Sequence, residues 1–220
     1  MAPRAGARHG VPMEYLTVRG RSSAAFTEKR SKFIATLALA ASTGDAEALF
    51  EQLRASNPGA RHCVTAYVLT GGSCHSSDDG EPQGTAGAPV LAVLTRRGLQ
   101  NTAAAVVRYF GGVLLGAPGL VRAYSRAAVL AADAAETVVM RRCAVFRASV
   151  GYAGLAQLEH RVRAAGGVIR APQYGARVTL EAVIPEERAG SFGGMLRACD
   201  PAAPPPEPAG LTFCPTALPA

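Results

Sequence analysis

Two glycine-rich loops constrain this chain more than any other feature of its sequence. The first reads S-D-D-G-E-P-Q-G-T-A-G-A-P at Ser77–Pro89, and the second reads R-Y-F-G-G-V-L-L-G-A-P-G-L-V-R-A-Y at Arg108–Tyr124. They flank an apolar segment, Val90–Leu94, and a strand-like run, Thr102–Tyr109. Loops of this length and composition inside a compact domain more often carry function than merely connect elements. We therefore predict that these two loops form the functional surface.

A composition shift at Arg141–Arg142 divides the chain into two predicted α+β domains, at residues 13–140 and 143–214. In the first domain, apolar runs predict strands, and apolar residues at helical spacing predict helices, one of which follows a capping box. The predicted strands are Glu14–Val18, Ser31–Leu39, Cys63–Thr70 and Thr102–Phe110, the last of which is a continuous apolar run that is expected to be buried on both faces or central. The predicted helices run from Ser42 to Pro58, from Thr85 or Gly87 to Thr95, and from Leu120 to Val139. A polar linker is expected between Val18 and Thr27.

The order of elements in the last third predicts a ferredoxin-like domain. That order is βαββαβ, the split βαβ arrangement. The predicted elements are a strand at Ala144–Tyr152, a helix at Leu155–Ala165, strands at Val168–Ala171 and Arg177–Ile184, a helix from Pro185 to about Ala198, and a strand near Leu211–Phe213. Residues 1–12 and 215–220 show no periodic pattern, and we expect them to be disordered.

Composition predicts a soluble cytoplasmic protein. The 220 residues are 49% hydrophobic and 18% charged, and no apolar run approaches the roughly 18–20 residues that a membrane helix needs, so we expect no membrane association. The N-terminus lacks the apolar stretch of a secretory signal. Five scattered cysteines, an odd number, indicate free thiols in a reducing compartment. The net charge of +7 permits an anionic partner such as RNA without requiring one.

Three carboxylates of the first loop, Asp78, Asp79 and Glu81, allow three interpretations. Clustered oxygens can ligate a divalent metal, or they can serve as general acid and base. Alternatively, Asp79-Gly80 forms a turn while Asp78 or Glu81 accepts backbone N–H bonds or pairs with Arg108. We favour this structural interpretation, because the EF-hand spacing is absent and no second carboxylate motif occurs elsewhere.

The second loop contains a candidate anion site. Gly111, Gly112 and Gly116 lead into a predicted helix whose first turn carries Arg122, and the backbone N–H groups at a helix start attract anions. The loop lacks the Lys-Ser/Thr of a P-loop and the G-x-G-x-x-G of a dinucleotide-binding fold. The same glycines equally permit a sharp turn and close backbone packing.

Two other patterns contain reactive side chains. His62-Cys63 and Cys74-His75 offer zinc-type ligands, but adjacent strand residues point to opposite faces and no C-x-x-C occurs. Ser76, Ser77 and Thr85 lie near acids and a histidine, yet the chain has no G-x-S-x-G nucleophile elbow. We therefore predict neither a metal site nor a cofactor.

Four motifs taken together resemble the Impact/YigZ family. They are E-K-R-S-K-F-I-A at Glu28–Ala35, A-R-H at Ala60–His62, S-D-D-G-E-P-x-G-T-A-G-x-P in the first loop and V-V-R-Y-F-G-G-x-x-L-G in the second. The resemblance covers most of the chain. It implies an N-terminal two-layer α/β sandwich like that of ribosomal proteins and elongation factors, and a ferredoxin-like C-terminal domain of the YigZ type. It also implies a role in translation, because eukaryotic Impact proteins regulate translation by binding the activator of a starvation-responsive kinase.

We accordingly expect a non-catalytic, translation-associated regulatory protein that binds RNA, the ribosome or a translation-control partner. The predicted binding residues, all in the two loops, are Asp78, Asp79, Glu81, Arg108, Tyr109, Gly111, Gly112, Gly116 and Arg122. Arg108 is expected to contact an anionic group of the partner, oriented by a carboxylate of the first loop. The alternative is a hydrolase for a phosphate-containing or peptide substrate, with Asp78, Asp79 or Glu81 as its catalytic acid or base.

Overall fold

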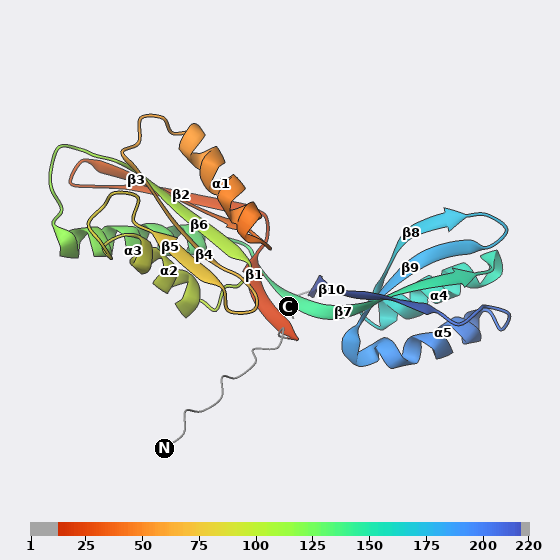
Figure 1. Ribbon diagram of the computed structural model, residues 1–220. Coiled ribbons are helices and arrows are strands. Elements are labelled where there is room, and N and C mark those ends of the chain that lie inside the picture. The colour runs from red at the N-terminus through yellow and green to blue at the C-terminus, as the bar shows by residue number, and fades with distance from the viewer. Residues whose placement is uncertain (1–12, 217–220) are drawn as a thin grey trace, which may run out of the picture. The chain divides into compact units, whose positions relative to one another are not determined.

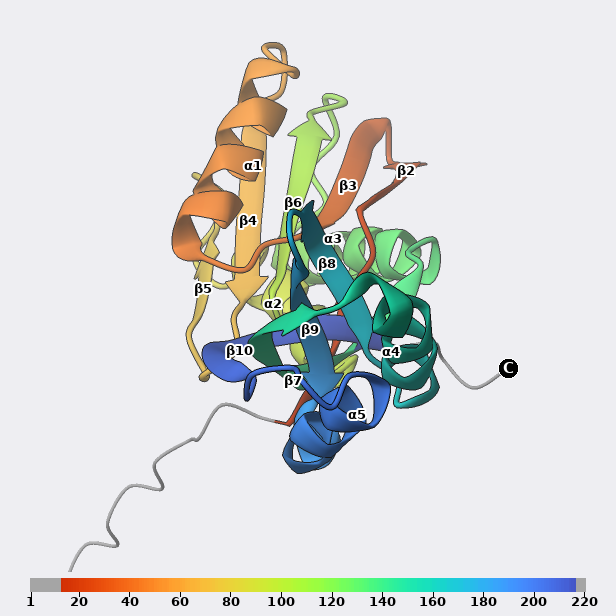
Figure 2. The ribbon, with the colours of Figure 1, turned by 90° about the vertical axis from the view of Figure 1, so that its right-hand side faces the viewer.

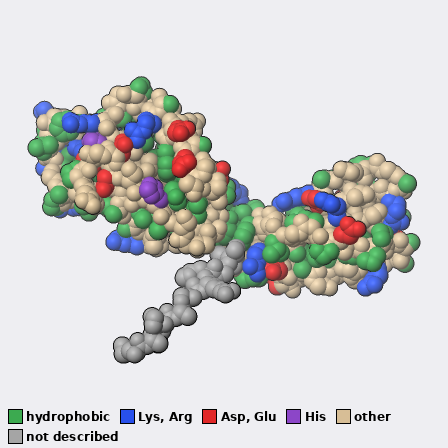
Figure 3. Space-filling view, in the orientation of Figure 1, with side chains coloured by type: hydrophobic (Ala, Val, Ile, Leu, Met, Phe, Trp, Pro, Cys, Tyr) green, Lys and Arg blue, Asp and Glu red, His purple; other side chains and the backbone are tan. Residues whose placement is uncertain are grey.

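The computed structural model describes residues 13–216, which form two compact units divided between Val139 and Met140 (Figures 1 and 3). Each unit has its own hydrophobic core. The predicted two-domain α+β architecture is therefore confirmed. The predictions for residues 1–12 and 217–220 lie outside the described residues. Among the helices that the structure describes, none is long and apolar enough to cross a membrane.

The N-terminal unit is built on a five-stranded antiparallel sheet with β6 (Thr102–Tyr109) at its centre. The strand order is β2-β3-β6-β4-β5, with β2 at Arg21–Glu28, β3 at Ser31–Leu39, β4 at His62–Val68 and β5 at Cys74–Ser77. Small and β-branched residues dominate β6, and all of them are buried as far as Arg108. The prediction of a central strand from its continuous apolar sequence is confirmed.

Helices lie on both faces of this sheet. α2 (Gly87–Arg96) and α3 (Ala117–Asp133) pack on one face, and α1 (Thr43–Ala55) packs on the other (Figures 1 and 2). The sheet with α2 and α3 makes the two layers implied by the family resemblance, and α1 adds a third. α1 begins with the predicted capping box, in which Ser42 and Asp45 each accept from the other's backbone N–H.

The main core of this unit lies beneath α2 and α3. Tyr124 of α3 is fully buried there and meets the ring of Phe33 edge-on, with ring centroids 5.2 Å apart. A smaller cluster around Leu53 and Cys63 lies beneath α1. The doubly covered sheet gives the loops at its ends a rigid base.

Three features of the N-terminal unit differ from the prediction by more than a few residues. Residues 19–27 were expected to be a polar linker, but most of them form β2, whose side chains alternate between exposed and half-buried because β2 is an edge strand. α3 ends at Asp133 instead of Val139, because the β-branched run that begins at Thr137 starts a strand. β5 was not predicted, since its four residues C-H-S-S carry no strand signal of their own.

A two-residue turn, Lys29-Arg30, joins β2 to β3. Glu28 pairs with Ser31, and both turn residues have positive φ, 44° and 66°. Two-residue hairpin turns need left-handed residues to match the strand twist, and Asn-Gly is the usual solution. Here two exposed cationic residues occupy these positions at the end of the sheet.

The C-terminal unit has the predicted βαββαβ order and a ferredoxin-like strand order, β10-β7-β9-β8. Its core includes Leu158 and Phe192 from its two α-helices. Pro215 and Thr216 were expected in a frayed tail but belong to the last strand. The elements are β7 (Thr137–Val150), α4 (Tyr152–Ala164), β8 (Val168–Tyr174), β9 (Val178–Pro185), the 3-10 helix η1 (Glu186–Ser191), α5 (Phe192–Cys199) and β10 (Glu207–Thr216); β1 (Glu14–Val18) belongs to the N-terminal unit.

Candidate functional site

Asp78 closes the first glycine loop onto the start of α2. Its Oδ2 accepts from Gly84 N at 2.7 Å, and its Oδ1 accepts from Ala86 N at 3.0 Å and Gly87 N at 2.8 Å. The N-cap residue Ala86 has no side-chain oxygen, so Asp78 supplies the acceptor from eight residues upstream. Partial burial raises the pKa of Asp78, but the three N–H donors outweigh burial and hold that pKa below its usual value.

Asp79 lies in a turn and joins two other elements. Its φ is 45° and that of Gly80 is 83°, so Asp79-Gly80 is the turn that the sequence predicts. Its carboxylate accepts from Arg54 Nη2 at 2.8 Å and from Cys63 N at 2.7 Å. Burial raises the pKa of Asp79, but Arg54 and the Cys63 N–H together lower it below the usual value.

Glu81 is buried, and its Oε1 atom is a point of convergence. Arg108 Nη1 donates to Oε1 at 2.6 Å, Tyr124 Oη donates at 2.7 Å, and His62 Nε2 lies 3.8 Å away. Burial, followed by the hydrogen bond to Glu81, raises the pKa of Tyr124 strongly, so this phenol stays protonated as a donor. A hydrogen-bonded charge pair, Glu81–Arg108, therefore joins the first glycine loop to the start of the second.

Arg108 is almost entirely inside the protein, with 4% of its surface exposed. Its Nη2 donates to Ser31 Oγ at 3.3 Å, and its guanidinium carbon lies 5.5 Å and 5.6 Å from the ring centroids of Phe33 and Phe110. Arg108 Nε is buried and has no hydrogen-bond partner within residues 13–216. Glu81 is the loop carboxylate that pairs with Arg108. Because Arg108 is buried, it is not available to contact an anionic group of a partner, which corrects the expectation drawn from the sequence.

A cavity of about 290 Å³ lies beside the Glu81–Arg108 pair. One side is polar, with Arg61 and His62 at the start of β4. The other side is the β6–α3 loop, residues 110–116, from which Leu114 projects with 81% of its surface exposed. The lining residues are Arg61, His62, Gly80, Glu81, Pro82, Arg108, Phe110, Leu114, Leu115, Gly116, Ala117 and Leu120. The cavity thus combines a buried ion pair with an apolar, exposed rim.

Tyr109 does not share this cavity. Successive strand residues point to opposite faces, so the Tyr109 side chain lies on the α1 side of the sheet. There its hydroxyl donates to Asn57 Oδ1 at 2.7 Å. The predicted site residues therefore divide between the two faces of the sheet.

Gly111 is required by packing. A Cβ at this position would lie 2.1 Å from the carbonyl carbon of Arg30, so the β2–β3 turn fits only against a glycine. Gly111 N also donates to Ser31 Oγ at 3.2 Å. Gly112 and Gly116 have φ of 81° and 71°, which explains glycine at both positions. In this loop, glycine serves backbone geometry and close packing.

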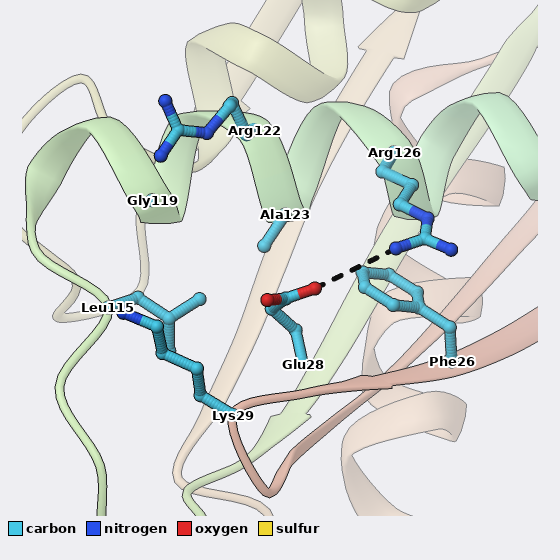
Figure 4. A pocket seen from close by; sticks show the side chains of 8 residues that line it. All are labelled: Phe26, Glu28, Lys29, Leu115, Gly119, Arg122, Ala123 and Arg126. Atoms are coloured by element: carbon cyan, nitrogen blue, oxygen red, sulfur yellow. Dashed lines mark ion pairs between the residues drawn. The ribbon is translucent and has the colours of Figure 1, made fainter.

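Arg122 lies apart from the Glu81–Arg108 cavity. It lines a second cavity, between α3 and the end of β2, in which no carboxylate of the first loop takes part (Figure 4). Arg122 belongs to α3, whose N-cap residue Gly116 provides no side-chain cap. Pro118, in the first turn of α3, has no N–H to donate. Arg122 is thus separated from Gly116, which lines the Glu81–Arg108 cavity, so the predicted anion site is divided between two cavities.

Sequence reasoning missed several partners in this site, among them Tyr124, Ser31 and Arg61. Tyr124 lies on the face of α3 where apolar residues recur at helical spacing, a pattern that indicates a core residue, and only its hydroxyl points to a polar partner. Ser31 and Arg61 lie inside the family motifs, but their spacing identifies no partner. Within residues 13–216, no group of three or more His, Cys, Asp or Glu side chains is placed to hold a metal ion.

Comparison with known proteins gives matches along most of the chain. The Impact N-terminal domain matches residues 29–132, and a domain of unknown function, DUF1949, matches residues 149–197. The chain is 32% identical to the IMPACT family member YvyE of Bacillus subtilis over 185 residues, covering 83% of this chain and 85% of YvyE. It is 36% identical to YigZ of Escherichia coli over 172 residues, covering 76% of this chain and 84% of YigZ.

A solved structure, the crystal structure of a hypothetical protein, has a similar fold along nearly the whole chain. Its TM-score is 0.64 at 30% identity, with 94% of this chain and 98% of that chain covered. The Impact N-terminal domain matches within the first compact unit, and DUF1949 matches within the second. This chain is therefore a member of the IMPACT family.

Proposed function

We propose that the chain is a non-catalytic regulatory protein of translation that binds a protein of the translation machinery through the β6–α3 loop. One observation carries the non-catalytic part: each of the three loop carboxylates accepts hydrogen bonds from within the chain. Asp78 and Asp79 have lowered pKa values, whereas a general acid or base at neutral pH needs a raised one. The proposed role in translation is the one that the family resemblance implies.

The exposed apolar side chains of the loop indicate the chemistry of the partner. Leu114 is 81% exposed, and Phe110 and Val113 beside it are also exposed. Apolar side chains grouped on a loop above a cavity fit the centre of a protein–protein contact, where a few residues supply most of the binding energy. The buried Glu81–Arg108 pair beneath them would hold the loop in shape for binding.

The hydrolase alternative needs a free carboxylate, and Glu81 is the best candidate because it lines the cavity beside His62. Its Oε1 accepts from both Arg108 and Tyr124, which favours a structural role. Screening phosphoesters and peptides with wild type and Glu81→Gln tests this alternative. Saturable turnover that Glu81→Gln abolishes would establish the hydrolase and refute the binding function.

Cosedimentation with purified bacterial ribosomes tests the proposal directly. Leu114→Ser removes the exposed apolar side chain, and Leu211→Ser in β10 is the matched control, since Leu211 is also an exposed leucine. We expect Leu114→Ser to lose cosedimentation and the control to keep it. The part of the cosedimentation that Leu114→Ser removes is expected to change little between about 50 and 200 mM salt, because an apolar contact releases few counterions. Equal binding by both variants, or no binding by wild type, would refute the proposal.

A further inference from the structure

A cavity of about 260 Å³ lies beside the β2–β3 turn and the first three turns of α3 (Figure 4). Its lining residues are Phe26, Glu28, Lys29, Leu115, Gly119, Arg122, Ala123 and Arg126. Leu115 also lines the Glu81–Arg108 cavity, so the two cavities are neighbours that share one side chain. The proposed function makes no use of this second cavity.

Its lining carries three cationic side chains and one carboxylate. The carboxylate, Glu28, lies 3.7 Å from Arg126 Nη1, and both side chains are about half exposed, so this pair is weak. Figure 4 shows the Arg122 guanidinium lying away from Glu28. Within residues 13–216, neither Lys29 nor Arg122 has an ion-pair or hydrogen-bond partner. Two positive charges of the cavity are therefore left without a counter-charge.

Arg126 is held in place by an aromatic ring. Its guanidinium carbon lies 4.6 Å from the centroid of Phe26, a distance at which the cation is attracted to the ring face. A guanidinium on an aromatic face keeps the N–H groups along its edge available for an oxygen ligand. The cavity thus has one ordered guanidinium and two unpaired cations around it.

We propose that this cationic cavity binds phosphate groups of an RNA chain. Guanidinium and ammonium donors are the groups that recognise phosphate oxygens. The choice of RNA as the source of the phosphate rests on the proposed role in translation.

A partly exposed aromatic ring lies at the same end of the sheet. Phe110 is 39% exposed and follows β6 directly, and the guanidinium carbon of Arg61 lies 5.8 Å from its ring centroid. Single-stranded RNA is held by such a combination, in which cations follow the backbone and aromatic rings stack bases. The adjacent cationic cavity and exposed aromatic ring favour a single strand over a free phosphate ion.

Fluorescence anisotropy with a labelled single-stranded RNA of about 20 nucleotides, longer than the footprint of roughly 4–16 that such sites cover, tests the proposal. The full chain is titrated at about 50 and 200 mM salt with Lys29→Gln, Arg122→Gln and Arg126→Gln. Each variant should lose about fivefold in affinity near 0.1 M salt, because one phosphate contact contributes about 0.7 to the salt slope of a single strand. Glu28→Gln should bind more tightly than wild type.

Arg161→Gln and Arg188→Gln are the matched controls. Both arginines line another cationic cavity, in the C-terminal unit, so they remove the same charge at a different place. Loss in the controls equal to that in the three variants would overturn the proposal, as would wild-type affinity in Lys29→Gln and Arg122→Gln.

Competition with inorganic phosphate and a nucleotide distinguishes the source of the phosphate. If either one binds in the cavity while RNA does not, the RNA assignment is wrong. Loss of RNA binding in the cavity variants, with ribosome cosedimentation still dependent on Leu114, would support both proposals as separate contacts. Absent RNA binding with intact cosedimentation would refute this inference alone.

Discussion

Arg108 Nη1 lies 2.6 Å from Glu81 Oε1, and both side chains are at least 95% buried. The pair joins the first glycine loop to the end of the central strand. Tyr124 of α3 donates to the same oxygen, so loop, strand and helix meet at one atom. Removing one partner of a buried ion pair leaves the other as an uncompensated charge, which makes this pair a sensitive point for stability.

Arg108→Met is expected to lower the free energy of unfolding by about 3–5 kcal/mol, because Glu81 is left buried without its counter-charge. Urea denaturation measures this change. The control Arg97→Met breaks the exposed pair with Asp133 and is expected to cost about 0–1 kcal/mol. Comparable losses in the two variants would show that the Glu81–Arg108 pair contributes no more than a surface pair.

Gly111→Ala is expected to destabilise the N-terminal unit by about 1–3 kcal/mol or more, as overpacking does. The new Cβ would lie 2.1 Å from the backbone of Arg30, so the turn or the loop must move. Gly194→Ala in α5 is the control, because its Cβ meets no atom within 4 Å and alanine favours a helix. A Gly111→Ala protein as stable as wild type would contradict the packing role. Thermal unfolding separates the two outcomes.

Asp78→Asn is expected to cost about 1 kcal/mol near pH 7, because asparagine keeps one acceptor oxygen but loses the second one and the negative charge at the start of α2. The pKa of Asp78 is lowered in the folded state, so its contribution is present above the unfolded value of about 3.9 and disappears as the pH falls through the lower folded pKa. The difference between wild type and variant should therefore shrink below about pH 4. Urea denaturation at several pH values measures it, with the exposed Asp133→Asn as control. A difference that grows towards low pH would reverse the predicted sign.

Thiol labelling at pH 8 is expected to begin at Cys74, which is exposed on β5. Cys63 and Cys143 are buried, and burial raises the pKa of the Cys63 thiol and, with the neighbouring Cys214, that of Cys143 to about 12. These two should react only when the protein unfolds. Ellman's reagent gives the rates, and Cys74→Ser should remove the fastest phase. Persistence of that phase in the variant would place the reactive thiol elsewhere.

Local features of the fold were predictable from the sequence. The Ser42–Asp45 capping box, the Asp79-Gly80 turn and the βαββαβ order each depend on residues close in sequence, and each was found. β2 was missed because an edge strand with one exposed face can carry R-S-S-A-A-F-T-E without an apolar run.

The contacts of the candidate site were predictable only in part. The sequence allowed a loop carboxylate to pair with Arg108, and it left open which one. The answer depends on which loop carboxylate the chain path brings beside β6, and Glu81 lies 27 residues from Arg108 in sequence. Tyr109 was grouped with Arg108 because they are neighbours in sequence, whereas the pleat of β6 sends them to opposite faces. Long-range pairing and strand geometry decided both cases.

The Lys29-Arg30 turn has a consequence for how this domain balances stability against binding. Left-handed backbone costs a non-glycine residue of the order of 1 kcal/mol, so glycine at either position would be expected to make the hairpin more stable. A more stable sequence lies one substitution away at each position. If the cationic cavity binds RNA, Lys29→Gly should raise the melting temperature and weaken the affinity for RNA. The lysine in this turn would then lower the stability of the domain in return for RNA binding.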